Sequence, residues 1–479
     1  MPGRFPRMST LPASVHQTIA PALAVSGGHL TVTAPDALAG PLMDALVRQA
    51  VFGSDEERAW ARWVIWEAAR AVGTYPASIH GFYMARGRGD VPPVTVPAMN
   101  IRGASYDTMR SIFRTANAMD GGAFILEIAR SEIAYTEQRP DEYVSVALAA
   151  ALREGFRGPV FIQGDHFQVN AKKYKADPTT ELDAVKQLVR EGIAAGFYNI
   201  DLDTSTLVDL AHPTLDAQQR LNYELGVELT RFARALEPAG ITVSLGGEIG
   251  EVGTENSTVP ELEAFMDGYN RTLAAQAPGM VGLSKISVQS GTSHGGVVLP
   301  DGSIAEVALD FQTLEDLSRV ARQRYGLSGA VQHGASTLPD GAFHHFPRTE
   351  TSEIHLATGF QNMLYDHLPA ALREAIYAWL RVHAAEERKA GDSDEQFFYK
   401  TRKKALGPFK RQLWDLPAEV RQTLAAAYDA KFTFLFEQLA VRGTKAGVRR
   451  FVTDTPVVRQ APGMAVVVEA APDDADAGE

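Results

Sequence analysis

The chain has 479 residues, 45% of them hydrophobic and 22% charged, which is typical of a soluble globular protein with one large domain or two to three ordinary ones. Its net charge of -12 argues against a nucleic-acid partner, and no apolar run reaches the ~18 residues of a membrane span. The absence of cysteine fits a cytoplasmic protein and excludes disulfides, iron–sulfur clusters and cysteine nucleophiles, so any transition metal must be held by His, Asp or Glu.

Residues 1–92 are predicted to form an N-terminal extension that is partly helical. The first twenty residues contain early arginines but no continuous apolar segment of the kind a secretory signal requires. The stretch "DEERAWARWVIWEAARAV" (55–72) predicts a helix, and we expect its tryptophans to pack on the rest of the protein rather than to bind a ligand.

Residues 93–380 alternate short β-rich runs with amphipathic stretches. The candidate strands are 94–100, 123–129, 159–165, 198–203, 242–248, 283–289, 329–334 and 351–357. Between two of them, "TTELDAVKQLVREGIAAG" (179–196) opens with a threonine cap and closes at Gly196, as helices do. Eight strands alternating with helices predict an α/β fold closed into a (β/α)₈ TIM barrel, and a doubly wound open sheet is the alternative.

The remainder of the chain divides into two parts. Residues 381–461 are predicted to be C-terminal helices, and they include a basic run, 399–411, that suits a small anion. Residues 462–479 are predicted to be an acidic, disordered tail.

Polar residues gather where the predicted strands end, which is where a barrel of this type carries its active site. They are Asp165 and His166 after the third strand, Asp201 and Asp203 after the fourth, Glu248 after the fifth, His294 after the sixth and His333 after the seventh. Three histidines with one open position are a common catalytic zinc arrangement. A single histidine at a loop start is more often a hydrogen-bonded surface residue, and His344, His345, His355, His367 and His383 are treated as spare imidazoles.

At these residues the chain resembles the class II, zinc-dependent fructose-bisphosphate and tagatose-bisphosphate aldolases. The resemblance rests on the order and spacing of "VTVPAMNI", "GDHF", "NIDLD", "GGEIGEVGTEN", "SGTSHGG" and "VQHGAS" between about residues 93 and 365. It implies that Asp165 is the catalytic acid/base and that Asn100 lies close to the substrate. It also implies that His166, His294 and His333 are zinc ligands, with Glu248 as a secondary ligand and Asp201 in support of the metal.

The resemblance implies reversible retro-aldol cleavage of a ketose phosphate, such as fructose 1,6-bisphosphate, to dihydroxyacetone phosphate and an aldehyde. This chemistry belongs to carbohydrate metabolism, glycolysis included, and needs Zn²⁺ or another divalent metal, with a role for a monovalent cation left open. Asp165 would move the proton of the C4 hydroxyl. A second acid/base would come from the loop "GEVGTENST" (250–258).

Two departures from the family pattern affect substrate binding and turnover. Asn256 stands where the family has its loop glutamate, so we assign that role to the preceding Glu255. In "EIHLATGF", Glu353 replaces an asparagine near the phosphate, and we expect its charge to repel a phosphate dianion.

Other phosphate-binding positions match the family. Gly295, Gly334 and Ser336 fit the phosphate loops, and Arg402 falls where the family brings an arginine from a neighbouring subunit, which implies a homodimer. The predicted partner is thus a small ketose phosphate, not a nucleic acid or a membrane.

Three interpretations remain open at this point. The first is a metal-dependent aldolase for this or a different ketose phosphate. The second is a non-catalytic or regulatory homologue that keeps the barrel. The third is a metal-dependent hydrolase, which is disfavoured because the first strand, "VPAMNIRG", has no His-x-His pair.

Overall fold

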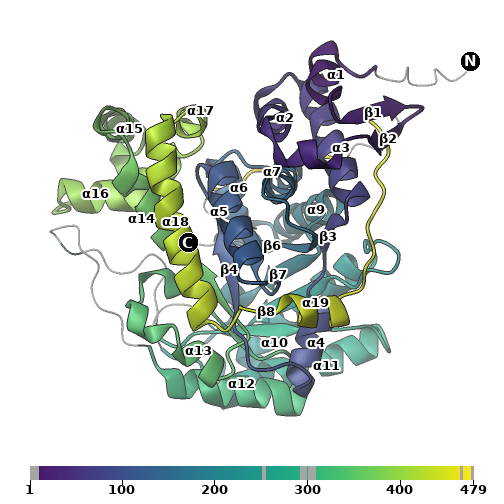
Figure 1. Cartoon of the computed structure of the whole chain (residues 1–479). Helices are drawn as coiled ribbons and strands as arrows, with labels where there is room; N and C mark the ends of the chain where they lie inside the picture. Colours follow the sequence, from purple (N-terminus) through teal and green to yellow (C-terminus); the bar gives the residue numbers. More distant parts are fainter. Residues whose placement is uncertain (1–9, 251–254, 292–298, 300–308, 464–467, 476–479) are drawn as a thin grey trace, which may run out of the picture.

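The computed structural model describes residues 10–250, 255–291, 299, 309–463 and 468–475, and eight parallel strands form a closed barrel at its centre (Figure 1). The strands are β4 (Val96–Asn100), β5 (Ile125–Ala129), β6 (Gly158–Gln168), β7 (Asn199–Asp203), β8 (Ser244–Glu248), β9 (Lys285–Val288), β10 (Ala330–Gln332) and β11 (Glu353–Leu356). They pair in the order β6-β5-β4-β11-β10-β9-β8-β7, and the pairing of β6 with β7 closes the ring. The predicted (β/α)₈ barrel is confirmed, and the open sheet is excluded.

Helices cover the outside of the barrel between successive strands. They are α5 (Ser105–Ala118), α6 (Arg130–Tyr135), α7 (Pro140–Arg153), α8 (Ala171–Ala176), α9 (Pro178–Ala195), α10 (Leu215–Arg234), α11 (Val259–Gln276), α12 (Phe311–Tyr325), α13 (His345–Arg348) and α14 (Thr358–His367). The helix expected over 179–196 is α9. Asp177, not a threonine, is its N-cap residue, and Gly196 ends it in the left-handed region at φ +107°.

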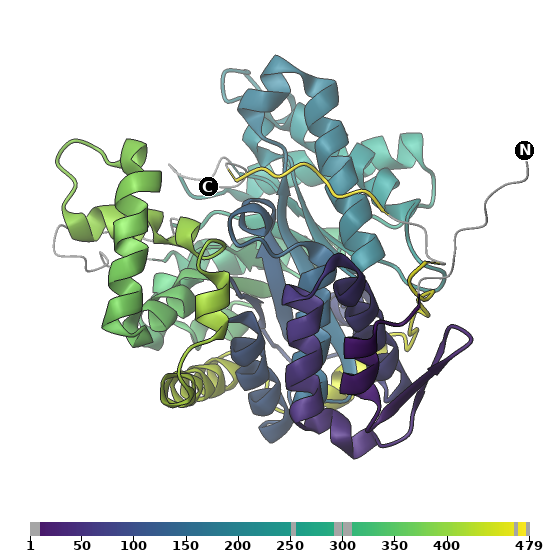
Figure 2. The same cartoon turned by 90° about the horizontal axis from the view of Figure 1, so that it is seen from above.

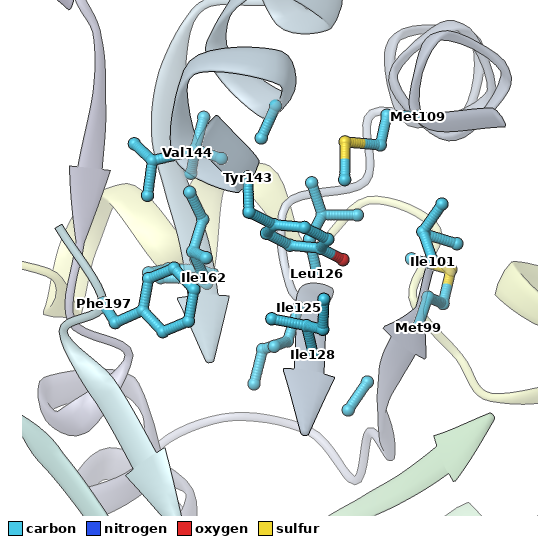
Figure 3. Packing of buried hydrophobic residues seen from close by; sticks show 14 of the residues in the cluster. Met99, Ile101, Met109, Ile125, Leu126, Ile128, Tyr143, Val144, Ile162 and Phe197 are labelled. Carbon is cyan, nitrogen blue, oxygen red and sulfur yellow. The ribbon is translucent and has the colours of Figure 1, made fainter. Parts of the chain in front are cut away.

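Apolar packing joins the strands to this helical layer. Tyr143 of α7 is fully buried among Ile128, Ile162 and Phe197 (Figure 3). Its hydroxyl donates a 2.6 Å hydrogen bond to the carbonyl oxygen of Glu127, which satisfies the one polar group of a buried aromatic ring. The outward side chains of β5 and β6 therefore anchor the wall, while polar side chains of the same strands face inward.

A ninth strand, β3 (Thr74–Ala77), lies outside the predicted barrel boundary. It pairs in parallel with Gly158–Phe161 at the start of β6, and β7 takes over as the neighbour of β6 from Gln163 onward. The Asn199 side chain joins the three strands, because its amide donates to the carbonyl oxygens of Ala77 (3.2 Å) and Ile162 (3.0 Å). The N-terminal extension is thus built into the sheet.

The remaining elements lie on the flanks of the barrel (Figure 1). The N-terminal set is α1 (Ala13–Ile19), β1 (Leu23–Ser26), β2 (His29–Val32), α2 (Pro41–Phe52), α3 (Asp55–Ala71) and α4 (His80–Arg88). The C-terminal set is α15 (Ala370–His383), α16 (Asp394–Thr401), α17 (Lys410–Trp414), α18 (Ala418–Gln438) and α19 (Lys445–Phe451). The α3 tryptophans are buried as expected, and two of them, Trp63 and Trp66, donate to carbonyl oxygens of the C-terminal segment. No helix in the described ranges is long and apolar enough to cross a membrane.

Candidate metal centre and active site

The Asp165–His166 pair lies inside β6, not after its end, because β6 continues to Gln168. The pairing of β6 with β7 shifts register between Gly164 and Phe167, and His166 has φ +39°. This is a β-bulge, which places one extra residue on the strand and re-aims its side chains. Adjacent side chains of a regular strand point to opposite faces, whereas here both Asp165 and His166 contact groups inside the barrel.

Gly164 leaves room for a side chain packed beside the bulge. A Cβ atom at this position would lie 2.4 Å from the ring of Phe167, which is closer than any real contact. Both ends of the "GDHF" sequence thus have a structural role, because the glycine makes room for the phenylalanine ring. His166, which has the unusual backbone conformation, lies between them.

Three of the predicted metal-binding side chains meet at the C-terminal end of the barrel. One nitrogen of His166, one nitrogen of His333 and one carboxylate oxygen of Glu248 all lie within 4.8 Å of one another. The His166 and His333 rings have centroids 4.4 Å apart at 83°, and the two residues come from strands on different sides of the barrel. All three are buried, and imidazole and carboxylate donors are those that Zn²⁺ accepts. His294 and Gly295 lie outside the described residues.

His355, which sequence reasoning set aside, is part of the same site. Its ring stacks on His333 with centroids 4.1 Å apart, and its Nδ1 lies 3.2 Å from Oδ1 of Asp165. Asp165, His333 and His355 form a second group with the spacing of a metal site. The alternation in "EIHLA" places Glu353 and His355 on one face of the strand, and this signal could have identified both as inward-facing.

Asp201 contacts Lys285 and His355 rather than the three residues that meet at the candidate metal centre. Its carboxylate lies 2.9 Å from Nζ of Lys285 and 3.7 Å from Nε2 of His355. The acid in direct contact with a candidate ligand is Asp203, whose Oδ2 is 3.2 Å from Nδ1 of His166. A carboxylate in that position orients a ligating imidazole and raises its basicity, so support of the metal by Asp201 stays a prediction.

Below these ligands, Lys285 forms a separate charged layer that sequence reasoning missed. Its Nζ is fully buried and lies 2.5 Å from Oε1 of Glu353 and 2.7 Å from Oε1 of Gln163, across the barrel. Burial disfavours its charge, but the carboxylates of Asp201 and Glu353 raise the pKa of Lys285 to about 12. Burial likewise opposes ionisation of Glu353, yet Lys285 and the hydrogen bond from His355 lower its pKa to about 2.

The expectation that Glu353 repels a phosphate stays a prediction, and the structure adds that this carboxylate is paired within the barrel. Glu353 is fully buried, accepts a hydrogen bond from the Tyr83 hydroxyl and pairs with Lys285. Its negative charge is balanced inside the barrel.

Acidic side chains outnumber lysines in the described part of the barrel interior. The buried acids are Glu127, Asp165, Asp201, Asp203, Glu248 and Glu353, against the single buried lysine Lys285. Burial and the neighbouring Asp203 raise the pKa of Glu248 well above its usual range. Burial lowers the pKa of the His166 imidazole, but Asp165, Asp203 and Glu248 outweigh it and raise that pKa to about 10. An interior of this kind favours cations.

The predicted substrate-binding residues occupy several positions. Asn100 is buried at the end of β4, where its amide donates a 2.5 Å hydrogen bond to Glu132 and its carbonyl oxygen has no partner among the described residues. Ser336 accepts a 2.5 Å hydrogen bond from the Ala357 amide with its hydroxyl, and Gly334 before it has φ +69°. These groups lie at the ends of β4, β10 and β11, which is the end of the barrel that carries the histidines.

Arg402 and the loop acid lie farther out. Arg402 is buried within its own chain, between the rings of Tyr365 (4.9 Å) and Tyr399 (4.3 Å), and it donates to Asn362. Glu255 is exposed, whereas Asn256 donates a 3.3 Å hydrogen bond to Asp310. The roles predicted for Arg402 in a partner's site and for Glu255 in turnover both stay predictions.

Comparison with known proteins gives a family and a fold. Residues 93–413 match the protein family described as fructose-bisphosphate aldolase class-II. A fructuronate-tagaturonate epimerase from Cohnella laeviribosi matches with a TM-score of 0.56 and 11% identity, covering 79% of this chain and 85% of that one. A probable tagatose 6 phosphate kinase from Sinorhizobium meliloti 1021 matches with a TM-score of 0.50 and 17% identity, covering 77% and 95%. A fructose-bisphosphate aldolase from Campylobacter jejuni has a TM-score of 0.45 and 16% identity, covering 78% and 97%. At such identities, the structural matches speak for the shared barrel alone.

Proposed function

Because this chain belongs to the class-II fructose-bisphosphate aldolase family, we propose that it is a metal-dependent aldolase acting on a ketose phosphate. The observation that carries the proposal is the convergence of His166, His333 and Glu248, with Asp165 beside them, at the end of the barrel where this fold places its active site. The proposal includes Zn²⁺ as the metal, a homodimer and a cytoplasmic location.

The donor set fits a divalent ion. Two imidazoles and a carboxylate would hold it, with His294 as the third predicted imidazole, and the acid-rich interior disfavours an empty site. The chemistry that such an ion supplies is Lewis-acid polarisation of the ketose carbonyl, which makes a lysine Schiff base unnecessary.

Asp165 is the residue we assign to proton transfer at the C4 hydroxyl. The nearby imidazoles of His166 and His355 outweigh the effect of burial and hold the pKa of Asp165 well below its usual range in the metal-free protein, so the carboxylate is ionised there. During cleavage it takes the hydroxyl proton as the C3–C4 bond breaks, and during condensation it returns that proton. Glu255 is assigned to protonation of the carbon atom at C3.

The test is metal content and retro-aldol turnover measured on one sample, with fructose 1,6-bisphosphate and fructose 1-phosphate, before and after chelation. We expect cleavage that is lost with the metal and restored by Zn²⁺. Comparison of the two substrates shows whether one or two phosphates are recognised. Bound zinc without cleavage of either sugar would contradict the aldolase assignment for these substrates and favour the non-catalytic homologue or a different ketose phosphate.

A second candidate is a metal-dependent epimerase of a ketose or its acid. It is favoured by the 3.2 Å contact of Asp165 with His355, which places two proton-transfer groups side by side next to the metal ligands. An epimerase removes and returns a proton without releasing an aldehyde. Product analysis by NMR separates the two candidates, since an epimer with no aldehyde would replace the aldolase proposal.

A further inference from the structure

The C-terminal segment 468–475 is docked along the outside of the barrel wall. Figure 2 shows this yellow segment crossing the teal helices of the wall. The Ala471 amide donates a 2.8 Å hydrogen bond to Glu191 of α9, and Gln187 of the same helix donates to the carbonyl oxygen of Glu469. Asp473 pairs with Arg139 at 2.6 Å and remains 68% exposed. This part of the chain contains no helix or strand.

Asp474, the next residue, is inserted into a basic pocket. It is 4% exposed, its Oδ1 lies 2.8 Å from Nζ of Lys173, and its Oδ2 lies 3.1 Å from Nη2 of Arg130. A buried carboxylate is tolerated only where cations and hydrogen bonds compensate the lost hydration. The residues around Asp474 therefore form an anion-binding site, and the Asp474 carboxylate is the anion that occupies it.

The charges of this pocket balance only when Asp474 is present. Arg130 also pairs with Glu181 at 2.6 Å, so two cations, Arg130 and Lys173, face two carboxylates, Glu181 and Asp474. Without Asp474 one positive charge is left over. The guanidinium of Arg130 is 4% exposed with Asp474 in place, and a net positive charge on the Arg130, Lys173 and Glu181 group favours binding of another anion.

The pocket is next to the candidate active site. Arg130 directly follows Ala129, which pairs with Asp165 across the sheet. Its guanidinium donates a 2.6 Å hydrogen bond to the carbonyl oxygen of Gln168, whose side chain donates a 2.5 Å hydrogen bond to Asp203. Asp203 in turn contacts His166, so three successive contacts connect the pocket to a predicted metal ligand.

We propose that Arg130 and Lys173 form a binding site for a small oxyanion at the rim of the barrel, and that Asp474 of the C-terminal tail competes for it. The ligand class is a carboxylate or phosphate group that takes the place of the tail carboxylate between Arg130 and Lys173. That this group belongs to the sugar substrate rests on the function proposed above. The existence of the anion site and the competition by Asp474 are independent of that function.

The experiment measures binding of inorganic phosphate to the full-length protein by isothermal titration calorimetry. An intramolecular competitor acts at an effective concentration in the millimolar range, so its removal strengthens binding of a free ligand. We expect Asp474→Asn to bind phosphate at least tenfold more tightly than the unmodified protein. Asp473→Asn is the matched control, because it removes the neighbouring exposed carboxylate, and we expect no change from it.

A second variant tests whether the gain occurs in this pocket. Lys173 is 48% exposed, so its replacement does not threaten folding, and Lys173→Ala combined with Asp474→Asn is expected to lose the tenfold gain. The gain should persist after chelation, because the pocket contains none of the predicted metal ligands. Equal binding in Asp474→Asn and the unmodified protein, or a gain that survives Lys173→Ala, overturns the proposal. Neither result depends on turnover, so failure here is distinct from failure of the aldolase proposal.

Discussion

The barrel interior contains two groups of charged side chains, one around Lys285 (the lower level) and one around His166, His333 and Glu248 (the upper level). Both groups bury carboxylates, but they compensate the negative charge in different ways. In the lower level, Lys285 balances Glu353 and Asp201 through contacts of 2.5 and 2.9 Å. In the upper level, His166, His333 and Glu248 have ligand atoms within 4.8 Å of one another, and the imidazoles become cations only by gaining protons. In the lower level the cation is the Lys285 ammonium group, whereas the upper level has the side chains to bind a metal cation.

This difference explains why a metal ion would bind at one end of the acidic cluster and not at the other. Six acids in one interior could attract a cation at several points, but a fixed ammonium occupies the deeper one. The end of the cluster nearer the C-terminal ends of the strands, where His166, His333 and Glu248 meet, is then the place where a divalent ion can replace the protons of the imidazoles. Each prediction below alters one of the two levels and measures the property expected of that level.

The largest effect is expected from the upper level itself. His166→Ala or His333→Ala removes one donor from a buried site, so we expect loss of stoichiometric metal and of turnover down to background. Metal content after gel filtration and retro-aldol activity measure both. His383→Ala is the control, because His383 is exposed and stacks on Trp379, and it should change neither quantity. Full metal occupancy in both ligand variants would disprove the assignment.

Asp165→Asn is expected to separate binding from chemistry. The amide keeps the shape of the side chain but cannot accept the C4 proton, and general-base catalysis contributes about 10²–10⁴-fold. We therefore expect kcat to fall by about that factor while zinc content stays stoichiometric. Loss of the metal together with activity would instead make Asp165 a ligand, in line with its place in the group with His333 and His355.

Lys285→Met removes the cation of the lower level and leaves Asp201 and Glu353 buried without compensation. Breaking a buried ion pair in this way costs about 3–5 kcal/mol, and we expect the free energy of unfolding in urea to fall by about that amount. Adding Glu353→Gln to Lys285→Met removes one of the stranded charges and should recover part of the loss. A loss below about 1 kcal/mol would show that the lower level does not depend on Lys285.

The sequence predicts the barrel and the convergence of the histidines for one physical reason. Closing eight parallel strands brings their C-terminal ends together, so residues as distant in sequence as His166 and His333 must meet once the strands are recognised. Each strand is recognisable as a short β-rich run whose outward side chains are apolar and which is bounded by helical or turn sequences.

The features that sequence reasoning missed depend on contacts across the barrel or on local backbone geometry. Lys285 is interpretable only together with Glu353 and Gln163, which lie on other strands. The β-bulge at His166 lies where one phenylalanine ring packs over Gly164. Strand β3 is short and pairs outside the regular alternation, so no periodic pattern marks it.

A pH dependence should distinguish the two levels in the metal-free protein, and its effect per pH unit is smaller than the effects above. The folded pKa of His166 is raised to about 10 from an ordinary value near 6.5, so its protonation stabilises the fold fully below pH 6.5. That contribution decreases as pH rises from 6.5 through about 10, with a slope of at most about 1.4 kcal/mol per pH unit for one proton. Lys285, with a pKa of about 12, stays charged over most of this window.

The measurement is a series of urea unfolding curves between pH 6 and pH 10, with and without chelator. The chelated protein should lose stability as pH rises. The zinc-loaded protein should not show this loss, because ligation requires neutral imidazoles and replaces the protons by the ion. His166→Asn should reduce the slope of the chelated protein by the contribution of one imidazole while leaving the contacts of Lys285 in place. Parallel curves for the chelated and loaded forms would mean that the upper level does not exchange protons for a cation, and the contrast between the two levels would have to be abandoned.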